Sequence, residues 1–173
     1  MDSICGVADA QGFSVKGEFV ICELSFYNFK YNLHRAFKPD IPWTRISSKE
    51  YKTLQFTRDN IHGLDLHPDE DLMGSSKARL VIVEFFRQIH EEGKFIGIKN
   101  NQLEQELKLL KIPYKRLDDA PKLSTLDENL NDLKPWTCIY HMKIDVPTPR
   151  CTMRKCFHLW SWVKNCKISP FYI

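Results

Sequence analysis

The chain has 173 residues, of which 43% are apolar, so it can bury one core of domain size. Its 25 basic and 22 acidic residues leave a formal net charge of +3, which excludes the strongly basic footprint of a dedicated DNA-binding domain. There is no basic, apolar leader and no long apolar run, so we expect neither secretion nor a membrane span. The six cysteines are therefore expected to be thiols or metal ligands rather than disulfides.

The first part of the chain is predicted to form antiparallel strands. Residues 1–16 are expected to be a flexible lead-in. The run G-E-F-V-I-C-E-L-S-F at 17–26 is rich in β-branched and aromatic residues, which is typical of a strand covered on both faces. Residues 29–38 alternate apolar and polar and predict its half-buried antiparallel partner. A third strand is expected near 52–57.

The second part alternates helices with short strands. Apolar residues at helical spacing predict a helix over 77–92, which Gly93 can end. Asn100 or Asn101 can cap the helix expected at 102–111. The remaining expected elements are strands at 94–99 and 114–117, a short helix opened by Ser124 or Thr125, and an amphipathic helix at 152–164. Antiparallel strands followed by β-α-β units predict an α/β fold, with a mixed sheet flanked by helices. The ribonuclease H-like fold of the DnaQ-type exonucleases has this order.

Three potential metal ligands lie close together in the sequence. Cys138 and His141 form a C-x-x-H pair, and Cys151 follows after a loop that contains prolines. Thiolate and imidazole donors favour zinc over calcium or magnesium, and three of them leave one position for another donor or for water. Cys156 and His158 are rival donors, but they are two residues apart on the expected last helix and point to different faces. His158 is expected at the surface or at an interface.

A magnesium site of the exonuclease kind is not expected. In the DnaQ-type exonucleases the first strand carries Asp-x-Glu, whose carboxylates hold a pair of magnesium ions. The corresponding tripeptide here is interpreted as Glu23-Leu24-Ser25, with one carboxylate, and the last helix contains no acid. Glu23 is flanked by apolar residues, so its carboxylate is expected to have a partner in the interior. Cys22, its neighbour, is expected on the opposite face of the strand, in the core.

Glu23 with Cys138, His141 and Cys151 gives the ligand order Glu, Cys, His, Cys, and with this order the chain resembles the Maelstrom domain of animal germline proteins. The resemblance covers roughly residues 17–165. It includes the text around Cys22-Glu23-Leu24, the C-x-x-H pair with a cysteine that opens a helix, and the helix leading into F-I-G-I-K. It implies a single ribonuclease H-like domain at 17–168 in which structural zinc replaces the two magnesium ions. We expect no HMG box before this domain.

The resemblance also implies a function. It implies binding of single-stranded RNA in piRNA-guided transposon silencing, together with small-RNA pathway proteins, in the cytoplasm, the nucleus or perinuclear granules. It further implies weak endoribonuclease activity that does not depend on the zinc ligands. The alternative is a non-enzymatic protein-interaction scaffold with the same fold.

Basic and aromatic residues near the expected metal site are the candidates for RNA binding, since this combination grips single strands without sequence preference. A solvated helix face is the alternative interpretation. The candidates are Lys143, Arg150, Arg154, Lys155, Trp162 and Lys164. Cleavage without a metal would need a general base, a general acid and a cation. His34, His62, His158, Lys155 and Arg154 could supply them, but no spacing selects a pair, so the catalytic residues stay unassigned.

Overall fold

The computed structural model of the chain describes residues 4–68, 71–89, 94–121 and 151–168. Its centre is a five-stranded mixed sheet in the order β3-β2-β1-β4-β5. The first three strands form an antiparallel meander, whereas β4 runs parallel to β1 and β5 parallel to β4. The strands are β1 (Ile4–Val15), β2 (Glu18–Tyr27), β3 (Asn32–Ala36), β4 (Phe95–Ile98) and β5 (Tyr114–Arg116).

The central strand, β1, occupies the segment that the sequence predicts to be a flexible lead-in, so that prediction is wrong for residues 4–15. The strand escapes detection because small residues recur along its middle, at Gly6, Ala8, Ala10 and Gly12. An added Cβ at Gly6 would overlap the ring of Phe26, and Ala8 and Ala10 lie fully in the core. A strand between close neighbours uses such residues, and they give little hydrophobic signal.

A β-bulge in β2 shapes the sheet beside Glu23. Gln11 pairs with Glu23 and the next residue, Gly12, pairs with Ile21, which leaves Cys22 as the extra residue. Cys22 is buried as expected, but it packs in the cluster of Phe13 rather than in the cluster on the opposite face. The bulge interrupts the alternation on which the opposite-face prediction rests.

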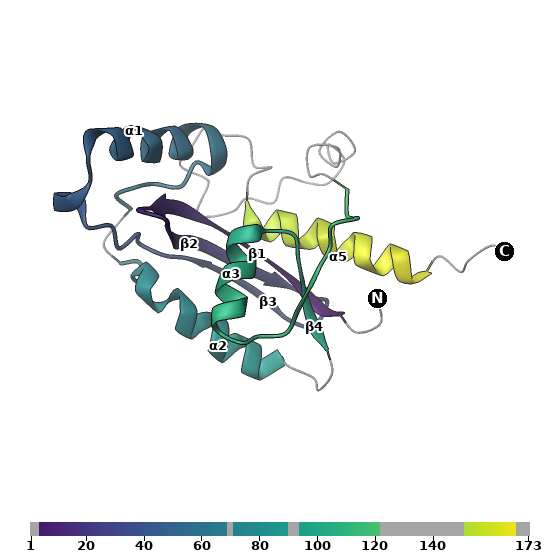
Figure 1. Cartoon of the computed structure of the whole chain (residues 1–173). Coiled ribbons are helices and arrows are strands. Elements are labelled where there is room, and N and C mark those ends of the chain that lie inside the picture. Colours follow the sequence, from purple (N-terminus) through teal and green to yellow (C-terminus); the bar gives the residue numbers. More distant parts are fainter. Residues whose placement is uncertain (1–3, 69–70, 90–93, 122–150, 169–173) are drawn as a thin grey trace.

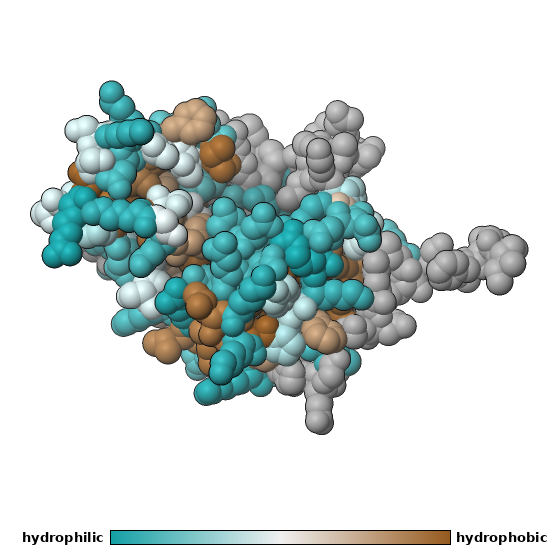
Figure 2. All heavy atoms as spheres, viewed as in Figure 1, coloured by the Kyte–Doolittle hydropathy of each residue, from teal (hydrophilic) through white to brown (hydrophobic). Residues whose placement is uncertain are grey.

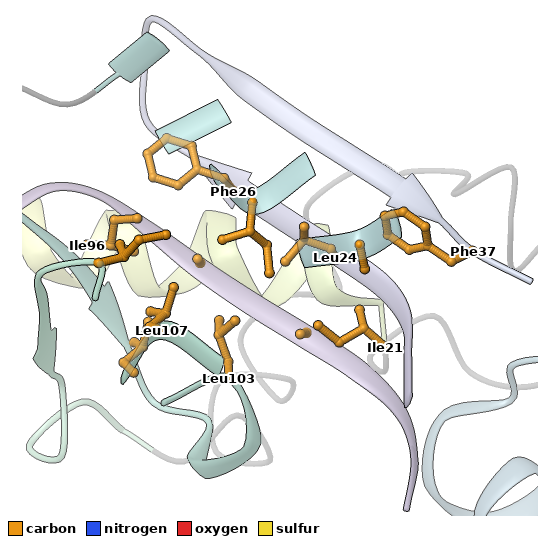
Figure 3. Close-up of a cluster of buried hydrophobic side chains, with 13 residues drawn as sticks. Ile21, Leu24, Phe26, Phe37, Ile96, Leu103 and Leu107 are labelled. Carbon is orange, nitrogen blue, oxygen red and sulfur yellow. The ribbon is translucent and has the colours of Figure 1, made fainter. Parts of the chain in front are cut away.

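Helices cover both faces of the sheet (Figure 1). α2 and α3 lie on one face, where side chains from both helices meet Leu24, Phe26 and their neighbours in the largest core cluster (Figure 3). α5 packs on β1 and β2 through a second cluster that includes Val7 and Leu159. The helices are α1 (Ser48–Thr57), α2 (Ala78–Ile89), α3 (Asn101–Leu109) and α5 (Thr152–Ile168). Short helical turns occur at Trp43–Arg45, Arg58–His62 and Ser75–Lys77.

Most predicted elements are confirmed, with slightly different ends: the strands near 17–26, 29–38, 94–99 and 114–117, and the helices near 77–92, 102–111 and 152–164. The strand expected near 52–57 is wrong, because this segment belongs to α1. Ser47 and Glu50 form a complete capping box that starts this helix. The short helix expected after Ser124 lies outside the described residues. Over the ranges that are described, no helix has the length and apolarity to cross a membrane.

Candidate metal centre between the sheet and α5

Three potential ligands converge between the sheet and the start of α5. Glu23 comes from β2, His34 from β3, and Cys151 directly precedes α5. Oε1 of Glu23 lies 2.7 Å from Nε2 of His34, and the Cys151 sulfur lies 4.0 Å from the same nitrogen. All three donor atoms lie within 4.8 Å of one another, and Glu23 and Cys151 are buried.

Strand pairing explains why His34 joins this group. His34 pairs directly with Ser25, while Glu23 pairs with Ala36. His34 is therefore the diagonal cross-strand neighbour of Glu23 on the same face of the sheet, within reach of a long side chain.

The donor set fits a borderline divalent ion such as zinc. Thiolate sulfur, imidazole nitrogen and carboxylate oxygen are the ligand types that zinc takes in proteins. Bonds of about 2.0–2.3 Å in a tetrahedron place neighbouring donors about 3.5 Å apart. The separations of 2.7 and 4.0 Å from Nε2 of His34 lie within about 1 Å of that edge. Small side-chain shifts would therefore let Glu23, His34 and Cys151 approach one ion.

The electrostatics of His34 match this arrangement. Burial lowers the pKa of His34, but the hydrogen bonds to Cys151 and Glu23 outweigh burial and raise this pKa to about 9. At neutral pH the imidazole thus carries a proton between two acidic groups. Since metal ligands must be deprotonated, a bound cation would replace protons that these groups otherwise share.

The second oxygen of Glu23 connects the cluster to α5. Oε2 accepts a hydrogen bond of 2.7 Å from the side-chain amide of Gln11, and one of 3.3 Å from the backbone N–H of Thr152 in the first turn of α5. Side-chain hydroxyls of Ser25 and Thr152 also bond to each other at 2.6 Å, with neither residue exposed. A buried polar layer therefore joins β2 to the beginning of α5.

This layer extends to β1 through Lys155 of α5. Its ammonium donates a 3.0 Å hydrogen bond to Oε1 of Gln11 and lies 3.5 Å from Oδ2 of Asp9. Asn100 donates to the other oxygen of Asp9 at 3.1 Å. Burial raises the pKa of the Asp9 carboxyl, while Lys155 and Asn100 act in the opposite direction.

The position of Asp9 corrects the strand assignment made from the sequence. The first strand is β1, which carries the tripeptide Asp9-Ala10-Gln11, and Glu23-Leu24-Ser25 belongs to the second strand. On β1 the carboxylate of Asp9 is followed two positions later by the neutral amide of Gln11. The ammonium of Lys155 lies 3.5 Å from Oδ2 of Asp9.

The predicted metal ligands are recovered in part. The structure brings Glu23 and Cys151 together, as the predicted set requires, whereas Cys138 and His141 lie outside the described residues. His34 was considered for catalysis but was missed as a member of this cluster. Its register opposite Ser25 depends on strand bounds that composition alone does not fix. Of the rival donors, Cys156 is fully buried with its thiol directed at the Ser25 carbonyl oxygen 3.5 Å away.

Two other histidines named as catalytic candidates, His62 and His158, are buried. His62 is buried, and its Nδ1 accepts from the N–H of Leu64, so its Nε2–H donates to the Gly12 carbonyl oxygen at 3.0 Å. His158 is 9% exposed, so it does not lie at the surface of the folded chain.

The described RNA-binding candidates do not form one row. Lys155 points into the polar layer, while Lys164 lies over the rings of Phe29 and Trp160. Arg154 and Trp162 are half-buried, and Trp162 packs on the α5 cluster. The predicted Lys143 and Arg150 lie outside the described residues.

The fold and this site define an α/β protein with a candidate metal centre between a mixed sheet and its last helix. No protein-family model, curated protein or solved structure matches the chain.

Proposed function

We propose that the protein is a Maelstrom-like domain with a ribonuclease H-like fold, which is held together by structural zinc and binds single-stranded RNA. One observation carries the proposal. Glu23 and Cys151, which belong to the Glu-Cys-His-Cys set, are far apart in the sequence yet meet in one buried cluster with a third donor, His34.

The sheet topology supports the fold assignment. Three antiparallel strands come first, and a β-α-β unit of β4, α3 and β5 follows, with α2 and α3 on one face and α5 on the other. The sequence predicts a ribonuclease H-like fold from the same succession of antiparallel strands and β-α-β units, although β1 takes the place of the third strand expected near 52–57. The Asp9-Ala10-Gln11 tripeptide on β1 adds the first-strand position of the exonuclease motif.

In the proposed site, Cys138 and His141 complete the coordination with Glu23 and Cys151. His34 then acts through Glu23, as a hydrogen-bond partner that orients the carboxylate. An ion with four protein ligands is closed to substrate, so its role is structural. It would fasten the start of α5 to β2, next to the hydrogen bond between Thr152 and Glu23.

The same geometry argues against a magnesium-dependent exonuclease. Asp9 is accompanied by an amide at Gln11, and the Lys155 ammonium already compensates the charge of Asp9. A pair of magnesium ions needs several carboxylates. This face supplies Asp9 and Glu23, but Glu23 is bonded to Gln11, His34 and the backbone of Thr152, and Asp9 lies beside the cationic Lys155. Weak metal-independent endoribonuclease activity stays part of the proposal, with its residues unassigned.

The cellular role proposed from the resemblance is small-RNA-guided transposon silencing in the germline, with piRNA-pathway proteins as partners and perinuclear granules as the site. A non-enzymatic interaction scaffold is the second candidate, and exposed leucines favour it. Leu80 on α2 and Leu109 on α3 are both largely exposed. Hydrophobic residues gather over α2 on the face shown in Figure 2, which is otherwise mainly hydrophilic.

Two measurements test the proposal. Metal analysis of the purified chain should give one zinc per molecule, and the Cys138→Ser/Cys151→Ser variant should lose it. Cys5→Ser is the matched control, because Cys5 is half-buried at the other end of β1 and bonds to the Phe95 carbonyl oxygen. Binding to labelled single-stranded RNA should weaken steeply with salt, as contact with several phosphates requires. Stoichiometric zinc in the double variant would refute the metal assignment, and absence of RNA binding would leave the scaffold.

A further inference from the structure

Two aromatic rings are exposed at the turn between β2 and β3. Phe29 is 70% exposed and Tyr31 is 50% exposed, although a phenylalanine on a compact domain is usually covered. The turn that carries them is well ordered by Asn28. Its side-chain oxygen accepts from the N–H groups of Lys30 and Tyr31 at 2.9 and 2.7 Å, and its side-chain amide donates to the Cys5 carbonyl oxygen.

Two lysines accompany these rings. The ammonium of Lys164, on α5, lies 5.5 Å from the ring centre of Phe29 and 5.0 Å from that of Trp160. Lys30 stands exposed in the turn itself. Among the described residues, no carboxylate forms an ion pair with Lys30 or Lys164. The patch is therefore both aromatic and positively charged.

We propose that the β2–β3 turn and the C-terminal half of α5 form the surface that binds single-stranded RNA, an inference that rests on the proposed function. We call it the turn surface, and its residues are Phe29, Lys30, Tyr31 and Lys164. Bases stack on the exposed faces of the two rings, and the lysines contact phosphates. Every base has a π-face, so this recognition tolerates any sequence.

Charge complementarity selects RNA over an apolar protein partner. An apolar docking site would leave two ammonium groups without a counter-charge at its centre, and burial of an unpaired cation is unfavourable. A polyanion with flat apolar bases matches both features at once. The order imposed by Asn28 also means that little conformational freedom is lost when a strand binds.

The turn surface is separate from the metal centre. Lys164 lies 13 positions along the chain from Cys151 (164 − 151), so at a rise of 1.5 Å per residue α5 separates them by about 20 Å. α5 thus connects both regions along one face of the sheet (Figure 1). Substitutions in the exposed turn can be tested without a change of metal ligands.

The experiment measures fluorescence anisotropy of a short labelled oligouridylate with the full chain at low salt. Loss of one ring on which a base stacks lowers affinity roughly five- to a hundredfold. We therefore expect Phe29→Ala/Tyr31→Ala to weaken binding at least about fivefold. Phe56→Ala is the matched control, because Phe56 is 60% exposed on α1. Phe29→Tyr should bind like the unaltered chain and Phe29→Leu should not, since stacking requires a ring.

The contribution of Lys30 is measured by the salt dependence of RNA affinity. Lys30→Ala should reduce the slope of log affinity against log salt by about 0.7, the contribution of one phosphate contact to a single strand. Lys49→Ala, an exposed lysine on α1, should leave the slope unchanged.

The outcomes separate this inference from the function on which it rests. If the unaltered chain binds RNA and the turn variants bind equally well, the turn surface is refuted while the proposed function stands. The same holds if Phe56→Ala weakens binding as much as they do. If the unaltered chain binds no RNA at low salt, the proposed function fails and the turn surface fails with it.

Discussion

Zinc should stabilise this protein strongly, and Cys151→Ser should remove most of that effect. The donors around Cys151 are already close together in the folded chain, and they separate when the chain unfolds. An ion that binds the folded state alone stabilises it by RT ln(1 + [L]/Kd), or about 4 kcal/mol at a thousandfold excess over Kd. In a protein of this size, 1 kcal/mol raises Tm by about 2–4 °C. Zinc should therefore raise Tm by roughly 8–16 °C.

The assay is thermal unfolding followed by circular dichroism, first after treatment with EDTA and then with zinc added back. A serine hydroxyl is a neutral, weaker donor than thiolate, so the Tm of Cys151→Ser should rise by a few degrees at most. Cys5→Ser should show the full rise, because Cys5 lies outside the cluster. An equal rise in Cys151→Ser and in the unaltered chain would refute the assignment of Cys151 as a ligand.

His34→Gln tests how His34 contributes. If His34 orients Glu23 and is not itself a ligand, this variant should keep stoichiometric zinc with an affinity about 10–100-fold lower. In free energy that loss is about 1.4–2.7 kcal/mol, so part of the Tm rise should remain. Complete loss of zinc would instead make His34 a ligand and would remove Cys138 or His141 from the proposed set.

Three further predictions concern the fold around the site. Gly12→Ala should lower the free energy of unfolding by about 2 kcal/mol or more in urea titrations, because an added Cβ would overlap the β2 backbone, whereas Ser14→Ala on the exposed side should have little effect. Ser25→Ala should cost about 1–3 kcal/mol by leaving the buried Thr152 hydroxyl unpaired, and Ser25→Ala/Thr152→Val should cost less than the sum of its single changes. Glu104, whose pKa is lowered to about 2 by hydrogen bonds from Lys108, Tyr114 and Arg116, should stabilise the fold above its unfolded pKa of about 4.5, and this contribution should be lost as pH falls through about 2. Glu104→Gln should flatten that part of the pH profile of urea unfolding, and Glu84→Gln should not.

The sequence predicts a helix correctly where the spacing of apolar residues and the capping residue indicate the same start. Asn100 illustrates this, since its side chain accepts from the N–H groups of Gln102 and Leu103 and starts α3 where the sequence predicts it. Sequence patterns mislead where alternation typical of a strand follows directly after a helix-capping motif. The segment T-L-Q-F-T at 53–57 alternates like a strand, but the capping box of Ser47 and Glu50 before it favours a helix.

Only part of the candidate metal centre could be predicted from the sequence. A carboxylate surrounded by apolar residues at Glu23 and a cysteine at a helix start are local signals, and both lead to the site. His34 has no such signal, because its position beside Glu23 depends on the register of two strands. The role of Lys155 was also hidden, since it follows from the true first strand, whose small residues give no strand pattern.

The two carboxylate oxygens of Glu23 connect the candidate metal centre to the packing of α5 on the sheet. One oxygen meets His34 in the cluster, and the other accepts from the first turn of α5, which contains no acidic residue of its own. The positive end of the α5 dipole is thus compensated by a carboxylate from β2. A metal ion bound at Glu23 and Cys151 would hold both partners of this contact and would fix the axis of α5 on the sheet. Because Lys164 lies on the same helix, its position beside Phe29 would then depend on an ion about 20 Å away.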